Sequence, residues 1–224
     1  MTHIRWPQII HPEFLRSSAF LCSLIIIIFI NPFLDESLVG RIVASLLVLT
    51  TMIGGFAVMF PHRDSIWLVI ILVSVSILIE LLSWTFRGIF VKEVTFLRNS
   101  IIYGIFALIL FYYLLKVQPL TLSEIGNAVS IYLLVGLSFG YFYCYYAQVY
   151  PMAFTVSEIS ESDKHLDLIY YSFITLTTTG FGDIHPLTKV PRLLAIFETV
   201  FGTFYIAVII GRLVGMGLKR NPES

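Results

Sequence analysis

The sequence has little charge for its length. Only 12% of its 224 residues are charged, whereas 58% are hydrophobic, and the mean hydropathy is +0.89. Soluble domains average about 25% charged residues. This shortage excludes an ordinary water-soluble domain, and we expect a multi-pass protein whose first partner is a lipid bilayer.

The sequence also has no excess of basic or of acidic residues. Basic and acidic residues balance at 14 each, so nothing favours a nucleic-acid partner. Cysteine is scarce, because Cys22 and Cys144 are the two in the chain, and both lie in apolar runs where a free thiol acts as a small hydrophobe. We therefore assign the cysteines no disulfide, metal or redox role. We also expect no enzymatic activity and no bound cofactor.

The first apolar run lacks a signal-peptide cleavage site. Arg5 and Arg16 precede it as in a signal peptide, but Asn31, Pro32 and Phe33 follow instead of small residues. We take this run as a retained first span.

Six stretches approach the length of about 20 apolar residues that a bilayer core requires. Charged or helix-breaking residues separate them. They are residues 17–34, 42–60, 66–86, 101–117, 128–149 and 190–216. Thr121 and Glu124 have the spacing of a capping box, which predicts that a helix restarts just before the fifth span. The predicted fold is an all-α membrane protein with six transmembrane helices.

A further apolar segment lies between the fifth and sixth spans. Residues 165–177 read HLDLIYYSFITLT, which is too short to cross a bilayer and typical of a re-entrant helix. Ser162 or Asp163 is predicted to cap its start, where acidic residues suit the positive end of the helix dipole.

This segment runs into TLTTTGFGD at residues 175–183. The stretch resembles the pore signature of potassium channels, TxTTVGYGD, with Thr179 in place of the usual valine and Phe181 in place of the usual tyrosine. The resemblance extends over residues 128–218, and the sixth span looks like that of small bacterial channels. It implies a potassium channel in a prokaryotic inner (plasma) membrane.

The chemistry of such a loop depends on its backbone. A potassium ion in a narrow pore exchanges its water shell for fixed oxygens, which backbone carbonyls supply. Carbonyls of successive residues share one axis only if alternate residues adopt φ values that suit glycine, here Gly180 and Gly182. We expect the K⁺ sites to be formed by the carbonyls of Thr178, Thr179, Gly180 and Phe181 and by the Thr178 hydroxyl.

Five residues around the loop are further candidates. Asp183 is predicted to form a ring of carboxylates at the outer mouth. Gly202 stands where this family has its inner-helix hinge. Glu198, inside the sixth span, either braces the pore helix through hydrogen bonds or has no effect on the filter, and Tyr170 or Tyr171 is the expected partner of the filter aromatic.

The sequence also lacks the gating arginines that a voltage sensor requires. Residues 1–118 occupy the position of a voltage-sensing domain, but the fourth span holds only Lys116. Since the membrane potential supplies about 2.3 kcal/mol per charge per 100 mV, we expect weak or absent voltage gating. Glu80, in the third span, is either a proton or voltage element paired with Arg87 or Arg98, or part of an interfacial salt bridge.

The assembly follows from the loop, because one filter strand cannot surround an ion. We expect a homotetramer, with a pore domain at residues 119–218 and a short cytoplasmic tail at residues 219–224. The basic residues divide evenly between the two sides and give no orientation, but an outer filter and six spans put both termini in the cytoplasm.

Gating would involve lipid or a separate regulatory partner. The alternatives are a non-selective cation channel, a non-conducting regulatory membrane subunit and, less favoured, a transporter.

Overall fold

Helices account for the regular structure in the part of the chain that the computed structural model describes. That part comprises residues 12–30, 33–34, 38–59, 67, 70–71, 74–78, 89–116, 122–155 and 161–219. The named helices are α1 (Pro12–Ile30), α2 (Leu38–Met59), α4 (Ile89–Lys116), α5 (Leu122–Val149), α6 (Glu161–Leu176) and α7 (Lys189–Lys219). The predicted all-α class is confirmed for these residues.

Five of these helices are long and apolar enough to cross a membrane: α1, α2, α4, α5 and α7. They also expose large apolar side chains, among them Phe29 (67%), Leu108 (69%) and Phe204 (68%), which suits contact with lipid or with other protein. The predicted third span lies mostly outside the described residues, and Glu80 and Arg87 lie wholly outside them.

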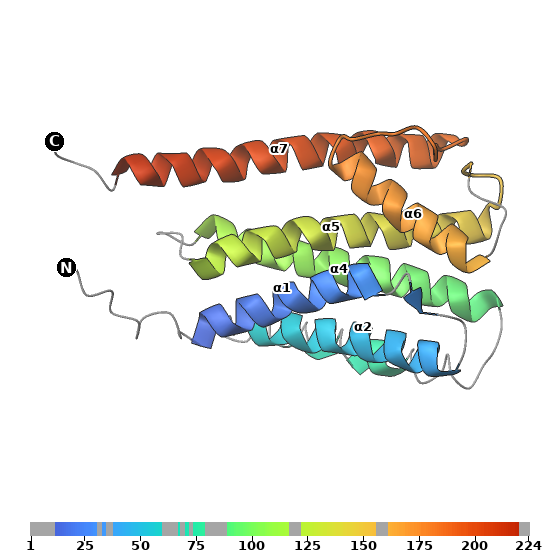
Figure 1. Ribbon diagram of the computed structural model, residues 1–224, viewed down its shortest axis with the longest axis horizontal. Helices are drawn as coiled ribbons and strands as arrows, with labels where there is room; N and C mark the ends of the chain where they lie inside the picture. Colours follow the sequence, from blue (N-terminus) through green and yellow to red (C-terminus); the bar gives the residue numbers. More distant parts are fainter. Residues whose placement is uncertain are drawn as a thin grey trace.

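The helices form an elongated bundle (Figure 1). α4 and α5 pack closely in its middle, α1 packs on both α2 and α5, and α6 lies between α5 and α7. α1 begins and α7 ends at the same end of the bundle (Figure 1). At that end the Ser17 hydroxyl donates to Asn127 Oδ1 at 2.6 Å, which joins the second turns of α1 and α5. Phe20, Tyr103 and Phe106 are fully buried in the core between these helices.

Helix α4 corrects the predicted fourth span. The sequence placed residues 87–98 in a charged connection, but α4 begins at Ile89. Arg98 therefore lies in the helix and is only 6% exposed. Its guanidinium donates to the Ser76 carbonyl at 3.1 Å and to Asn99 Oδ1 at 2.8 Å. The prediction was wrong because hydropathy treats an arginine as a boundary, whereas buried hydrogen-bond acceptors let a helix carry one inside.

Helix α6 also begins earlier than predicted. Because it starts at Glu161, Ser162 and Asp163 lie in its first turn, and the prediction that one of them is the N-cap was wrong. Polar residues of a first turn carry no apolar periodicity, so the sequence pattern missed them. The length of 16 residues corresponds to about 24 Å, which is still short of the roughly 30 Å hydrocarbon core.

The other helix bounds are closer to the prediction. α5 begins at Leu122, where the capping-box spacing places a helix start, although Thr121 lies outside the described residues. α1 both begins and ends about one turn before the predicted first span.

Candidate functional site: the loop that follows helix α6

Helix α6 ends in a tight chain reversal. The amides of residues 177–180 all turn back to carbonyls of the last helical turns. The Thr179 N–H donates to Ile174 O at 2.9 Å, and the Thr178 N–H donates to Thr175 O at 3.0 Å. This pair of bonds is a Schellman motif, with Thr178 at the position that normally requires a left-handed residue. The end of the helix therefore fixes where the loop begins.

Positive φ angles then alternate along the loop. They are 60° at Thr178, 53° at Gly180 and 81° at Gly182. This is the alternation that turns successive carbonyls toward one side of a strand. Among the described residues, Thr178 is the one non-glycine residue with a positive φ. A β-branched side chain there stores strain on the order of 1–3 kcal/mol. The sequence pattern did not predict this strain, because the conformation was expected at glycines alone.

The hydroxyl of Thr179 has a partner. Its Oγ1 lies 2.9 Å from Thr177 Oγ1, which lies 2.7 Å from the Phe173 carbonyl. A carbonyl can only accept, so the Thr177 proton goes to Phe173 and the Thr179 hydroxyl donates to Thr177. The threonine that replaces the usual valine is thus hydrogen-bonded to the end of the helix.

Tyr170 supports the residue that follows the loop. Its phenol donates to the Asp183 carboxylate, and the pKa of Tyr170 is raised by desolvation, by this hydrogen bond and by the charges of Asp183 and Asp167. A tyrosine phenol is protonated at neutral pH and can act as this donor. Tyr170 was predicted as a partner of Phe181, whereas the contact that the structure gives it is with Asp183.

Tyr171 packs against α5 and the segment that follows it. It is buried, and its ring packs edge-on against Tyr143 at 5.2 Å and Phe154 at 5.6 Å. Phe181 is 71% exposed on the protomer. Tyr171 therefore belongs to the packing between α5 and α6.

Glu198 lies behind the loop, on α7, and has no exposed surface. Its Oε2 lies 2.8 Å from the Tyr143 hydroxyl of α5, and its Oε1 lies 2.5 Å from Ser172 Oγ of α6. The carboxyl group thus joins all three helices of this region. Its hydrogen bond to α6 is the contact that the bracing hypothesis requires.

The last carbonyl of α6 is a second meeting point of three helices. Leu176 O accepts a hydrogen bond from the Tyr132 hydroxyl of α5 at 3.1 Å. A Cβ on Gly202 of α7 would lie 2.1 Å from the same oxygen, so only glycine allows α7 this close. α7 runs as a single helix through Gly202, whose hinge role stays a prediction. Tyr132 was missed because nothing in its apolar span marks it.

The outer end of the loop is tied to the segment that follows α5. The Thr155 N–H donates to His185 O at 3.1 Å, and the Leu187 N–H donates to Ala153 O at 2.7 Å. These two bonds form a short antiparallel bridge. Both ends of the loop are therefore fixed by backbone hydrogen bonds.

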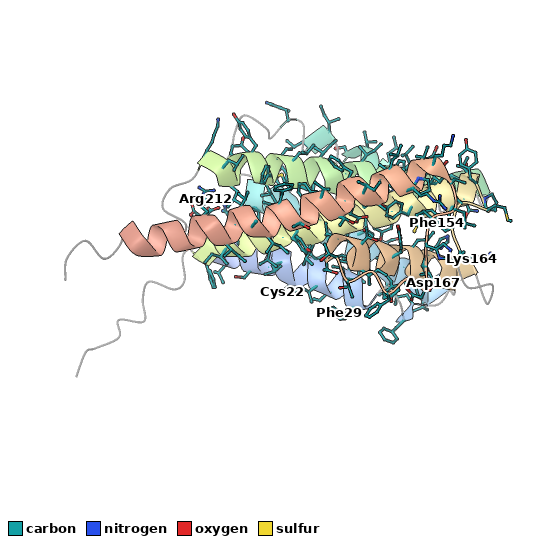
Figure 2. The ribbon with its side chains drawn as sticks, turned by 90° about the horizontal axis from the view of Figure 1, so that it is seen from above. Cys22, Phe29, Phe154, Lys164, Asp167 and Arg212 are labelled. Atoms are coloured by element: carbon teal, nitrogen blue, oxygen red, sulfur yellow. The ribbon has the colours of Figure 1, made fainter. Side chains whose placement is uncertain are left out.

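The far half of α7 is tied to α4. Arg212 lies at the opposite end of the molecule from Phe154 and Asp167 (Figure 2). Its Nη1 donates to the Leu114 carbonyl near the end of α4. About two turns earlier, the Tyr205 ring packs against Phe111 of α4 at 6.1 Å.

Comparison with known proteins finds one family. Residues 128–218 match the family described as Ion channel, a region that spans most of α5, all of α6, the loop and nearly all of α7. The chain matches no curated protein. The match supports an ion-channel pore-loop module in this region and passive ion conduction; the matching family is normally one of transporters rather than enzymes. With the five apolar helices, it makes the chain an integral membrane protein.

Proposed function

We propose that this protein is a potassium channel that conducts K⁺ passively through residues 178–182. The alternation of positive φ at Thr178, Gly180 and Gly182 carries the proposal. It occurs directly after a helix too short to span a bilayer, and it leaves the carbonyls of the loop free to replace the hydration shell of an ion. The loop lies in the region that matches the ion channel family.

The pore itself requires four copies of the chain. Residues 177–183 are exposed on the single protomer, as expected if they line an axis shared by a homotetramer. Asp183 would then contribute one carboxylate per subunit at the outer mouth and raise the local cation concentration.

Six crossings, with both termini cytoplasmic, fit the arrangement of the helices. α2 ends at the end of the bundle where α1 begins, and α4 begins at the opposite end (Figure 1). Residues 70–71 and 74–78, between these two helices, are helical. We place the protein in a prokaryotic inner membrane, with lipid or a separate protein as its regulator.

A non-selective cation channel is the second candidate. Phe181 lacks the phenol that the potassium signature has at this position, and Tyr170 bonds to Asp183 instead. Without that hydrogen bond the filter is less constrained in width, which favours weaker discrimination between K⁺ and Na⁺.

Ion flux into liposomes tests the proposal. Purified protein should pass K⁺ down its gradient, barium should block the flux, and Gly180→Asp should abolish it while leaving tetramers intact. Equal K⁺ and Na⁺ fluxes would favour the non-selective channel. Intact tetramers with no flux of either ion would favour a non-conducting regulatory subunit.

A further inference from the structure

The hydrogen bonds around Glu198 do not balance if its carboxyl group is ionised. Ser172 Oγ lies 2.5 Å from Glu198 Oε1 and also 2.7 Å from the Gly136 carbonyl of α5. A serine hydroxyl has one proton to donate. An ionised carboxylate and a carbonyl can both only accept, so one of these two short contacts would lack a proton.

One assignment of protons satisfies every contact. The Ser172 hydroxyl donates to Gly136 O, because a carbonyl oxygen has no proton to offer. Ser172 Oγ is then free to accept, and the proton in its contact with Oε1 must come from Glu198. The Tyr143 hydroxyl donates to Oε2. Donation runs in one direction, from Tyr143 to Glu198, then to Ser172, then to Gly136.

The surroundings of Glu198 favour the same protonation state. The side chain is fully buried, and an isolated ionised carboxylate in an apolar interior is so unfavourable that such groups usually become neutral. Among the described residues, the titratable groups that face it are tyrosines: Tyr132 and Tyr143 of α5 and Tyr171 of α6. None of these described side chains facing Glu198 is a lysine, arginine or histidine that could neutralise a carboxylate.

The backbone geometry supports the arrangement. Gly136 of α5 lies close against α6, since a Cβ at this position would lie 2.6 Å from the Phe173 ring. The close approach brings the Gly136 carbonyl within reach of Ser172, one residue before Phe173. The position of the acceptor is therefore set by helix packing.

We infer that Glu198 holds a proton at neutral pH and acts as a hydrogen-bond donor to the pore helix, so that α5, α6 and α7 are joined by a neutral carboxylic acid. This inference goes beyond the conduction of ions and stands whichever ion permeates. Glu198 is a positioning residue, because it acts on the loop through Ser172 and α6. The loss of its proton at alkaline pH would leave two acceptors competing for the Ser172 hydroxyl and put a negative charge behind the loop.

Infrared difference spectroscopy on the full-length protein in lipid tests the protonation state directly. The spectrum of the wild type minus that of Glu198→Gln should contain the carbonyl stretch of a protonated carboxylic acid at neutral pH, shifted in D₂O. Glu124→Gln on α5, whose side chain is partly exposed, is the matched control and should not remove that band. A difference spectrum with only the bands of an ionised carboxylate would overturn the inference.

The pH dependence of thermal unfolding is the second readout. The unfolded chain would release the proton that the folded protein holds, so the unfolding equilibrium constant should rise about tenfold per pH unit for each such proton. The melting temperature of the wild type should therefore fall as the pH rises through neutrality, more steeply than that of Glu198→Gln. Identical pH profiles for the two proteins would overturn the inference. Neither readout requires conduction. The inference about Glu198 can therefore be overturned while the proposed channel function stands, and the channel function can be overturned while the inference stands.

Discussion

At the scale of single residues, the Leu176 carbonyl links the loop to both flanking helices. The amides of residues 177–180 bond to carbonyls upstream of it, and it accepts a hydrogen bond from the Tyr132 hydroxyl instead. Loss of that donor would leave a buried acceptor unsatisfied, which costs about 1–3 kcal/mol. The position is two residues before Thr178, the first residue of the proposed filter.

Replacing Tyr132 by phenylalanine removes this donor and keeps the ring. We expect Tyr132→Phe to lower the permeability ratio of K⁺ over Na⁺ several-fold, because the end of α6 that orients Thr178 loses a hydrogen bond. Reversal potentials under mixed K⁺ and Na⁺ measure this ratio.

Tyr205→Phe is the matched control. The Tyr205 ring lies 5.8 Å from that of Tyr132, and its buried hydroxyl donates to the Ala128 carbonyl within α5 at 2.6 Å. It should leave the permeability ratio unchanged. Equal effects of both substitutions would indicate general destabilisation and contradict a specific role for Tyr132.

Several residues of the site could be predicted from sequence, because their chemistry depends on residue type. Gly180 and Gly182 adopt the positive φ values expected of them, and Glu198 is buried against α6, as a lone acid in an apolar span suggests. The positive φ of Thr178 and the contact of Tyr132 with Leu176 could not be predicted in the same way. The first comes from a helix-terminating motif and the second from contact between distant segments, which the local pattern does not encode.

At the scale of elements, apolar length predicted the helices well and charge predicted their ends poorly. The ends of α5 and α6 were predicted to within about one turn, but α4 begins well before residue 101. Its early part carries Arg98, whose charge is accommodated by Ser76 and Asn99. Such partners are known only once the helices are packed together.

The contact between α4 and α7 predicts an effect on gating. Arg212 donates to the Leu114 carbonyl, where a cation near a helix C-terminus contributes about 0.3–1 kcal/mol. We expect Arg212→Gln to change the open probability by about two- to fivefold, which corresponds to that energy, without altering the reversal potential. Single-channel recording measures both quantities.

Lys116→Gln is the control for this substitution. Lys116 also lies at the end of α4, but its ammonium group contacts the Tyr112 ring of the same helix. Its removal takes away a similar charge without breaking the contact with α7. An Arg212→Gln channel with the open probability of the wild type would show that this contact does not influence gating.

At the scale of the whole molecule, the described helices before the pore module, α1, α2 and α4, carry little charge that a voltage could move. Arg98 is the buried basic side chain in the described part of α4. A full charge crossing the membrane contributes about 2.3 kcal/mol per 100 mV. We expect a shallow dependence of conductance on voltage, with at most about one effective charge per subunit. Conductance recorded over a range of voltages measures that valence, and a steep curve that requires several charges per subunit would contradict the expectation.

The central claim is that four copies of residues 178–182 form a filter that prefers K⁺. The most direct measurement is the reversal potential of the purified protein in a planar bilayer, with K⁺ on one side and Na⁺ on the other. We predict that this potential follows the K⁺ gradient and moves with it when the K⁺ concentration is changed. A reversal potential that stays near zero and is insensitive to the K⁺ gradient would contradict it.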